Sequence, residues 1–341
     1  MKLIKVLFFL GLFFLKTIYA ANVQPILPAP LTENQFIEKM VKEYHFDQKE
    51  LTLLLGQAEV LPEVIERCNK PFEEKPWDFY RNFFITPDRV QGGVVFWHEH
   101  ADTLEKVSKA YGIPPEIIVA ITGIETKYGQ QTSKFPALST LKTLAFHYPK
   151  RAAFFQNELE NFLLLTRENH LSPNSLMGSY AGALGIPQFM PSTYRKYAIS
   201  FDKAHSVNLL TDKDDAIASI AYYLQQSGWQ PNQPVATPAL IDQPMPTDLL
   251  VAGAKPIYNQ TFLIQHGVHS KVPLINPPPA CLIALHNTHG EEYWLSYPNF
   301  YAIMTYNPRT TYAMAIYQLS EQIRQAYEGS IQTSTGTPTT R

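Results

Sequence analysis

A single carboxylate stands among aliphatic side chains in the stretch "VAITGIETKYG", Val119–Gly129. If a helix begins at Pro114-Pro115, where the first turn needs no amide donor, Glu125 shares one face with Ile117, Ile118, Ile121 and Ile124. Because burial disfavours a charge, this environment is expected to raise the pKa of Glu125. A carboxyl group that keeps its proton near neutral pH is what a general acid needs to cleave a glycosidic bond.

A purely structural role for Glu125 is the alternative. A glutamate near the end of a helix can direct its carboxylate to a cation such as Lys127 or an arginine at the edge of the core. Periodicity alone favours this ion pair. The catalytic hypothesis therefore depends on what else the chain places nearby.

A loop rich in glycine and proline lies downstream, "GSYAGALGIPQFMPSTY", Gly178–Tyr194. Glycines allow close approach of the backbone to a ligand, and prolines stiffen the chain. Ser179 and Gln188 are neutral hydrogen-bonding groups that suit sugar hydroxyl and acetamido groups. An ordinary Gly/Pro loop would look similar. The serine does not stand in a G-x-S-x-G elbow, so a serine hydrolase is not indicated.

The elements that would position these groups are mainly helical. Apolar periodicity and capping residues predict helices over residues 32–46, 47–68 with a break at Pro62, 94–112, 114–129, 150–169, 191–199, 214–228 and 306–327. Residues 77–90 have the pattern of a loop. Residues 280–297 predict two strands around an Asn-Thr-His-Gly turn.

These elements give a mainly α (α+β) fold with several parts. We expect a signal peptide over residues 1–20, an N-terminal helical region over 30–112 and a catalytic core over 113–234. A small β-containing insertion at 235–295 begins where the chain becomes dense in proline. A helical part of the core at 296–327 follows, and a low-complexity, disordered tail at 328–341 ends the chain.

Composition and the N-terminus restrict the class of protein. With 28 Lys and Arg against 30 Asp and Glu, the chain of 341 residues has no basic block that would favour nucleic acid as a partner. A hydrophobic share of 45% indicates a folded core. The segment before Ala20 has two lysines and then an apolar run too short to span a membrane, which is typical of a secretory signal. No cysteine is near that junction for lipid attachment, so we expect a soluble periplasmic protein.

Four segments together resemble the membrane-bound lytic murein transglycosylase B family. They are "GIETKYG" (Gly123–Gly129), "SYAGALGIPQFMPSTYRKYA" (Ser179–Ala198), "DAIASIAYYLQQSGW" (Asp215–Trp229) and "NFYAIMTYNPRTTYAMAIYQL" (Asn299–Leu319). The resemblance runs in order over roughly residues 30–325, with separations like those of the family. "ETKYG" alone would be a weak signal, but four motifs in order are a specific one.

The resemblance implies a lysozyme-like catalytic core that acts on peptidoglycan glycan strands. The family cleaves the β-1,4 bond between N-acetylmuramic acid and N-acetylglucosamine without water and forms a 1,6-anhydromuramoyl end. Its catalytic glutamate corresponds to Glu125. The substrate-binding residues that it implies here are Ser179, Tyr180, Gln188, Tyr306, Asn307 and Tyr312. No cofactor is expected, the protein is expected to be a monomer, and other cell-wall enzymes are candidate partners.

One departure from the family concerns metal. Members can carry an EF-hand-like calcium loop after the second motif, but the corresponding stretch "FDKAHSVNLLTDKDDA" has Lys203, Ala204 and His205 where an acidic, glycine-containing turn is needed. We therefore expect no calcium site. Elsewhere, "HEH" at 98–100 lacks the second histidine of a zinc-protease motif, and the pairs at 266/269 and 286/289 only weakly indicate metal binding.

Two questions stay open at this point. An oxidising compartment would permit a disulfide between Cys68 and Cys281, and two separate buried thiols fit as well. A hydrolytic muramidase that uses two carboxylates, or a non-catalytic wall-binding protein that keeps the groove, are the rival functions. Product analysis and replacement of Glu125 distinguish them.

Overall fold

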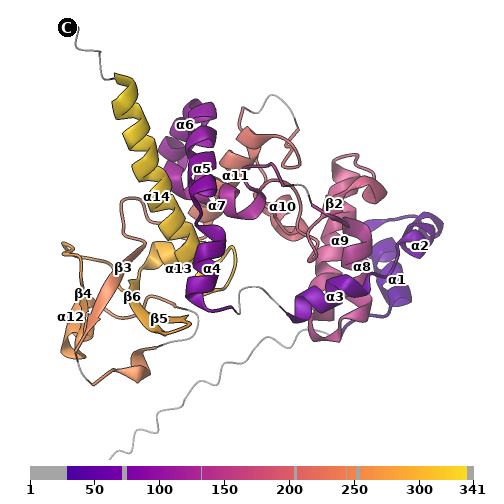
Figure 1. Ribbon diagram of the computed structural model, residues 1–341. Helices are drawn as coiled ribbons and strands as arrows, with labels where there is room; N and C mark the ends of the chain where they lie inside the picture. The colour runs from indigo at the N-terminus through magenta and orange to yellow at the C-terminus, as the bar shows by residue number, and fades with distance from the viewer. Residues whose placement is uncertain are drawn as a thin grey trace, which may run out of the picture.

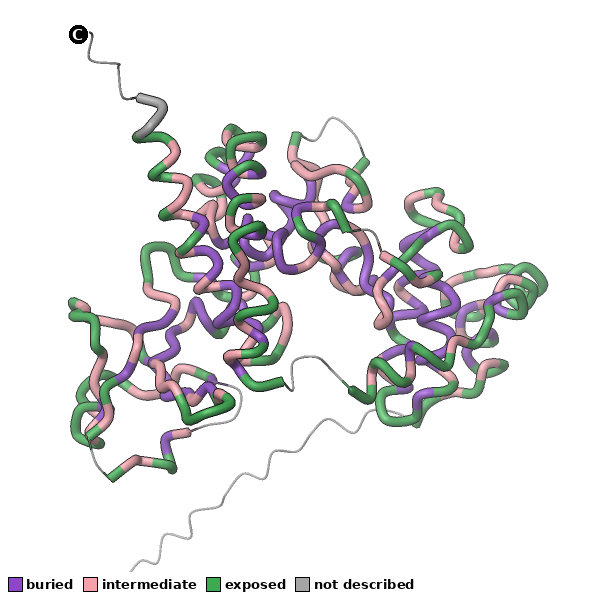
Figure 2. Tube along the Cα trace, viewed as in Figure 1, coloured by how far each residue is buried: buried purple, intermediate pink, exposed green. Residues whose placement is uncertain are grey.

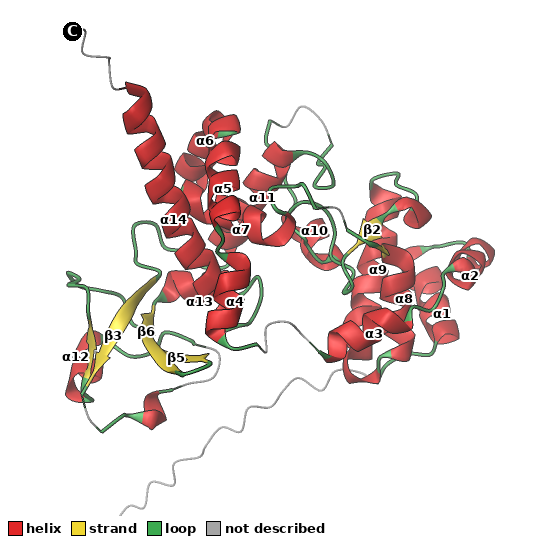
Figure 3. Ribbon diagram, viewed as in Figure 1, coloured by secondary structure: helices red, strands yellow, loops and turns green. Residues whose placement is uncertain are grey.

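The computed structural model describes residues 29–70, 75–131, 133–202, 206–242, 244–250 and 254–335. Two helical bodies and a small sheet make up this part of the chain (Figures 1 and 3). The expected signal peptide and the last six residues lie outside it. Within the described residues, no helix combines the length and the apolar character that crossing a membrane requires.

Helix α7 (Pro115–Thr126) is at the centre of the first body. Every residue from Ile117 to Ile124 is buried, so the helix is apolar around its whole circumference rather than on one face. The helices and strand that pack around it or beside it are α4 (Trp77–Phe84), α5 (Pro87–Glu99), α6 (Ala101–Tyr111), α11 (Lys213–Gln226), α13 (Pro298–Met304), α14 (Thr310–Thr335) and β5 (Cys281–Asn287). Pro115 occupies the first turn of α7, and Lys127 ends the helix in the left-handed conformation with φ 47°.

The second body is built on the antiparallel pair α8 (Ala137–His147) and α9 (Ala152–Glu168). Helices α1 (Glu33–Tyr44), α2 (Gln48–Gln57) and α3 (Pro62–Asn69) cover the pair and share its core. The predicted cap at Thr32 is confirmed, because Thr32 and Gln35 form a reciprocal capping box. Figure 2 shows that buried chain runs through both bodies.

The glycine- and proline-rich loop belongs to the second body and contacts the end of α7, where Thr126 Oγ1 donates to the carbonyl of Ile186 at 3.0 Å. It starts at strand β2 (Met177–Gly178), which pairs with β1 (Phe135–Pro136), and ends at helix α10 (Pro191–Tyr197). Buried residues of this loop and of α10 belong to the core of the second body. Short 3₁₀ turns over Pro149–Arg151, Pro173–Ser175 and Thr247–Leu249 complete the connections.

The expected β-containing part is an antiparallel sheet at one end of the first body (Figure 3). Its strands, in the order β4-β3-β6-β5, are β3 (Ala236–Ile241), β4 (Val268–Ser270), β5 and β6 (Gly290–Ser296). The hairpin β5–β6 confirms the two strands predicted around the Asn-Thr-His-Gly turn. Helix α12 (Gln260–Gln265) packs beside β4.

Three sequence predictions about these elements were wrong. The segment expected to be a loop forms α4, because Trp77, Tyr80 and Phe84 recur at helical spacing and join the core. The single helix expected over 94–112 is two helices, α5 and α6, which meet at His100. The tail expected to begin at residue 328 is helical to Thr335, and Ser330 within it bonds to His98 Nε2 at 2.9 Å.

The two cysteines are both free thiols. Cys68 is half-buried in α3 of the second body, and Cys281 is buried in β5 of the sheet. The alternative of two separate thiols is therefore the one that this structure supports.

Candidate active site

Glu125 lies in the last turn of α7 and is half-buried. Its Oε1 accepts a hydrogen bond from the hydroxyl of Tyr312 on α14, at 2.6 Å. Burial, and then the negative charge of Glu125, hold the pKa of Tyr312 well above its ordinary value. Tyr312 therefore stays protonated and keeps donating to Glu125 over the whole physiological pH range.

Lys127, the cation considered as a structural partner for Glu125, is exposed just beyond the helix and has the left-handed conformation. The Glu125 carboxylate accepts a hydrogen bond from the neutral phenol of Tyr312. Because the phenol carries no charge, it does not fix the carboxylate in its ionised form as an ion pair would.

Tyr306 forms the next part of the site. Its ring stacks on that of Tyr312, with centroids 6.3 Å apart, and contacts the rings of Phe189 and Tyr223. Its hydroxyl donates to the carbonyl of Pro187, which ties the chain after α13 to the glycine- and proline-rich loop. Burial and the charge of Glu125 raise the pKa of Tyr306 well above its usual value, so this hydroxyl also remains a donor.

The loop is folded so tightly that its sequence is constrained. Gly185 has φ 71°, and a Cβ there would lie 2.2 Å from the carbonyl oxygen of Leu209. Ser179 Oγ accepts the amides of Ala181 (3.2 Å) and Ala183 (3.1 Å), so its hydroxyl proton is the group that it can offer to a ligand. Gln188 Nε2 donates to the carbonyl of Gly185 at 2.7 Å, which orients the side-chain amide.

A cavity of about 410 Å³ brings several predicted residues together. Gln188, Tyr306 and Asn307 line it, as does Ala181, two residues after Ser179. Glu125, Tyr312 and Ser179 are not among its lining residues, but Tyr312, which donates to Glu125, stacks on the lining residue Tyr306. The predicted residue Tyr180 is half-buried against the core of the second body and does not line the cavity.

Sequence reasoning missed Arg151, which lines the same cavity at the start of α9. Its guanidinium lies over the ring of Phe154 at 4.1 Å from the centroid, and Phe154 also lines the cavity. The signal was weak but present: a cation at the beginning of a helix opposes the helix dipole and needs another reason to be there.

In the stretch that can bind calcium in related proteins, acidic residues of this chain accept hydrogen bonds from backbone amides. The buried carboxylate of Asp215 accepts the amides of Phe201 and Asn208, each at 2.8 Å, and so closes the loop between them. Asp212 caps α11 by accepting the amides of the next two acidic residues. Residues 203–205 lie outside the described chain. These described carboxylates do not fit a calcium ligand set, and the absence of such a site stays a prediction.

The histidines that suggested metal have other neighbours. His100 Nδ1 bonds to Asp214 at 2.8 Å, and His98 Nε2 bonds to Ser330 at 2.9 Å. His269 pairs with Asp242, and His286 pairs with Glu291. Within the described residues, no three His, Cys, Asp or Glu side chains come together as a metal site would require.

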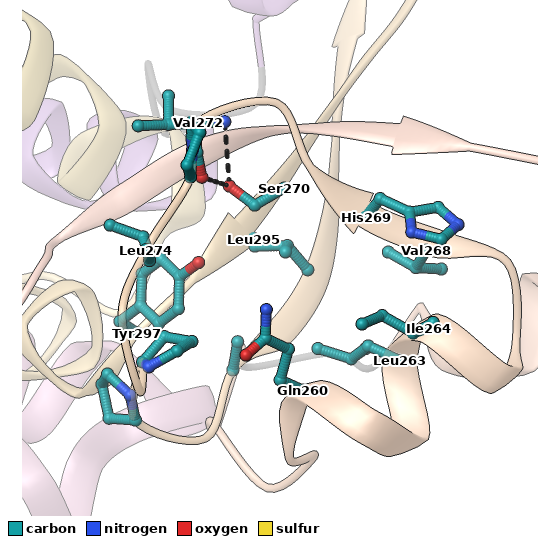
Figure 4. Close-up of a pocket in the computed structure, with 14 residues that line it drawn as sticks. Gln260, Leu263, Ile264, Val268, His269, Ser270, Val272, Leu274, Leu295 and Tyr297 are labelled. Carbon is teal, nitrogen blue, oxygen red and sulfur yellow. Dashed lines mark hydrogen bonds between the residues drawn. The ribbon is translucent and has the colours of Figure 1, made fainter.

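A cavity of about 290 Å³ lies between α12 and the sheet, and no residue of α7 lines it. Figure 4 shows Leu263 and Ile264 of α12 facing Val268 and Leu295 across it, with Ser270 bonded to Val272 at its rim. The described residues that line it include no carboxylate. It therefore lacks the acid that glycosidic cleavage requires.

Comparison with known proteins identifies the family of the chain. A sequence model of the family described as "Transglycosylase SLT domain" matches residues 32–321. Over 302 residues the chain is 42% identical to membrane-bound lytic murein transglycosylase B of Escherichia coli, covering 86% of this chain and 82% of that protein.

Solved structures of lytic transglycosylases are also similar to this chain. Soluble lytic transglycosylase SltB1 of Pseudomonas aeruginosa is 39% identical with a TM-score of 0.80, covering 86% of this chain and 98% of that one. E. coli Slt35, solved in complex with calcium, is 42% identical with a TM-score of 0.79 and coverage of 86% and 93%. P. aeruginosa SltB3, in complex with NAG-NAM-pentapeptide, is 26% identical with a TM-score of 0.74 and coverage of 86% and 78%.

The family match spans most of the chain, and the helical architecture is that of lysozyme-like lytic transglycosylases. The predicted fold class and reaction are therefore confirmed. The chain belongs to the transglycosylase SLT domain family and is a lytic transglycosylase that acts on peptidoglycan.

Proposed function

We propose that Glu125 performs both proton transfers of the lytic transglycosylase reaction. Its carboxyl group first gives a proton to the glycosidic oxygen, and the bond from that oxygen to C1 of N-acetylmuramic acid breaks. The ionised carboxylate then takes the proton of the C6 hydroxyl while O6 bonds to C1 and closes the anhydro ring. Glu125 ends the cycle protonated, and no water is consumed.

The observation that carries this proposal is the hydrogen bond from Tyr312 to Glu125, beside the cavity lined by Gln188, Tyr306 and Asn307. Because Oε1 already accepts the phenol proton, the proton that is transferred belongs on Oε2. The same bond stabilises the carboxylate after the first transfer, when its charge is greatest. One carboxylate thus serves as acid and then as base, unlike the two of ordinary glycosidases.

The other predicted residues act on the substrate rather than on the proton. With no second catalytic carboxylate in the loop Ser179–Tyr194, the substrate's own N-acetyl group stabilises the developing positive charge at C1. The side-chain amides of Gln188 and Asn307 and the hydroxyl proton of Ser179 suit that acetamido group and the sugar hydroxyls. Tyr306 contributes its ring to the cavity wall, since its hydroxyl is engaged by Pro187.

The substrate is the glycan strand of peptidoglycan, reached in the periplasm. This location rests on the signal-like N-terminus of the sequence, and on the wall-directed activity of the family. We expect the enzyme to act as a monomer without a cofactor. Other cell-wall enzymes are the candidate protein partners.

The test is replacement of Glu125 by glutamine, which keeps the shape of the side chain and removes its acid. Release of anhydromuropeptides from purified sacculi, followed by mass spectrometry, should fall by about 10²- to 10⁴-fold, while sacculus binding persists. Glu116→Gln is the matched control. Glu116 lies in the first turn of the same helix and faces Arg324 at 3.9 Å, so its loss should leave the product yield intact.

The outcomes separate the rival functions. Reducing muramic acid ends in place of anhydro ends would identify a hydrolytic muramidase. Sacculus binding without product from the wild-type chain would identify a wall-binding protein. Full activity of Glu125→Gln would remove Glu125 from the mechanism.

A further inference from the structure

Two buried threonines of α7 use their hydroxyl groups differently. Thr122 Oγ1 donates to the carbonyl of Ile118, one turn earlier in the same helix, at 2.9 Å. This is the usual bond of a threonine inside a helix. Thr126 Oγ1 lies 3.5 Å from the corresponding carbonyl of Thr122 but 3.0 Å from the carbonyl of Ile186, in the glycine- and proline-rich loop. Because Thr126 follows Glu125 directly, the proposed acid stands next to a hydrogen bond that leaves the helix.

The hydroxyl of Thr126 also stabilises the turn that ends α7. Its oxygen accepts the amide of Gly129 at 3.1 Å, and the backbone carbonyl of Thr126 accepts the amide of Gln131 at 2.8 Å. Between these bonds, Lys127 and Tyr128 both have positive φ, at 47° and 64°, which is uncommon for residues that carry side chains. The Thr126 hydroxyl thus uses its proton to bind the loop and a lone pair to hold this turn.

The contacts between α7 and the loop form a closed ring. Tyr312 donates to Glu125 and stacks on Tyr306. The hydroxyl of Tyr306 donates to the carbonyl of Pro187, and the carbonyl just before it in the chain accepts the Thr126 hydroxyl. Since Thr126 is joined to Glu125 by a peptide bond, the ring closes on the proposed acid. Thr126 supplies the step of this ring in which α7 bonds to the loop directly.

Close packing is incomplete beside the Thr126 hydrogen bond. Thr126, Gly185 and Ile186 all line a cavity of about 350 Å³. Where side chains do not fill the space, packing restricts movement less, and a hydrogen bond contributes more to the distance between helix and loop. The described residues that line the cavity with Gln188 and Tyr306 do not include Thr126. Its hydroxyl therefore acts on the distance between two parts of the site rather than on a bound sugar.

We propose that Thr126 is a positioning residue of the lytic transglycosylase reaction, whose hydroxyl sets the distance between the Glu125 carboxyl group and the loop that carries Gln188. The inference rests on the proposed function, because Thr126 acts through Glu125. Both proton transfers require this carboxyl group to reach a sugar held against the loop, first at the glycosidic oxygen and then at the C6 hydroxyl. A displacement of about 1 Å in such an arrangement costs about 100-fold in rate.

The first test removes the hydroxyl and keeps the shape of the side chain. Thr126→Val should lower kcat for anhydromuropeptide release from soluble glycan strands by about 10- to 100-fold, and KM should change less than about twofold. Thr126→Ser keeps the hydroxyl and should stay within about threefold of the wild-type kcat. Thr122→Val is the matched control. It removes a buried hydroxyl of the same helix that bonds within the helix, so its kcat should be that of the wild type.

These variants separate positioning from a merely structural role. Thermal midpoints are measured for each variant, and kcat is measured well below the lowest of them. Equal kcat for Thr126→Val and Thr122→Val, or a loss in Thr126→Ser as large as in Thr126→Val, would overturn the proposal. If Thr126→Val does not fold, Thr126→Ala and Thr126→Ser supply the comparison, because they differ by one hydroxyl. The serine variant should then have a kcat about tenfold higher, and equal values would overturn the proposal as well.

A second experiment tests whether Thr126 acts through Glu125. In the Glu125→Gln chain, adding Thr126→Val should lower the residual kcat by less than about twofold, because no acid is left to position. A full further loss would show that the two residues act independently, which refutes a positioning role. Full activity of Glu125→Gln would refute the proposed function itself. An inactive Glu125→Gln together with an unaffected Thr126→Val would refute only the role of Thr126.

Discussion

At the scale of single residues, the site depends on a carboxyl group held by a phenol. The hydrogen bond from Tyr312 fixes the direction of the Glu125 carboxyl group. A lysine in the same place would also neutralise the charge of the carboxylate, which the phenol does not do. Tyr306 stacks on Tyr312 and is bonded to Pro187, so Glu125, which we propose as the catalytic acid, is connected through two rings to the glycine- and proline-rich loop. These contacts connect α7, α14 and the loop to one another at the site.

Tyr312→Phe tests this arrangement directly. Loss of the hydroxyl removes one hydrogen bond to the Glu125 carboxylate, and hydrogen bonds to charged groups contribute about 1.5–3 kcal/mol. We expect kcat for anhydromuropeptide release to fall by about tenfold or more with little change in KM, because substrate contacts persist. Tyr301→Phe, which removes a more exposed phenol, is the control. A Tyr312→Phe enzyme with wild-type kcat would show that the bond has no catalytic role.

At the scale of elements, Tyr128 determines how closely α5 and α7 approach. Its ring lies against Gly92 and its hydroxyl against Gly123, where added Cβ atoms would come within 2.8 Å and 2.6 Å of it. These two glycines therefore leave the room that a buried tyrosine needs between two helices. The motif "GIETKYG" thus combines the proposed catalytic residue Glu125 with the residues that pack its helix against α5.

Gly123→Ala tests whether packing against Tyr128 or helix propensity determines the effect of this glycine on stability. Alanine is the better helix former by about 1 kcal/mol, but here its methyl group collides with Tyr128, and overpacking costs about 1–3 kcal/mol. We expect a lower free energy of unfolding in urea and reduced activity. Gly56→Ala is the matched control, because a Cβ there in α2 meets nothing within 4 Å and should stabilise by about 0.5–1 kcal/mol. Stabilisation at both positions would contradict the packing argument.

The sequence predicted most of the elements but not how distant residues meet. Glu125 could be found because a carboxylate on an apolar helix breaks the local pattern, and the hairpin β5–β6 because its turn is explicit. Helix α4 was missed because it is only eight residues long and is stabilised by contacts with the first body rather than by its own caps. Arg151 was missed because a cation at the start of a helix is only a weak signal, and its position at the cavity is set by tertiary contacts.

At the scale of the whole molecule, burial of tyrosines limits stability at alkaline pH. Of the 19 tyrosines, Tyr306 and Tyr312 have pKa values well above the ordinary one because they are buried near Glu125. Burial likewise raises the pKa of Tyr317 to about 12. A group whose pKa is higher in the folded state contributes its full stability below the unfolded value of about 10, and loses it as the pH rises through the folded value.

We therefore expect the thermal midpoint to change little up to about pH 10 and to fall steadily above it, with cooperative unfolding as buried phenols ionise. The ultraviolet absorbance of tyrosinate, followed together with circular dichroism, should show an early phase from exposed phenols and a late phase that coincides with loss of helix. Tyr317→Phe should move that late phase to higher pH, because the largest cause of its raised pKa is burial in the native state. Tyr301→Phe, at a side chain that is 37% exposed, is the control and should leave the late phase unchanged. If both variants unfold at the same pH as the wild type, burial of Tyr317 does not set the alkaline limit.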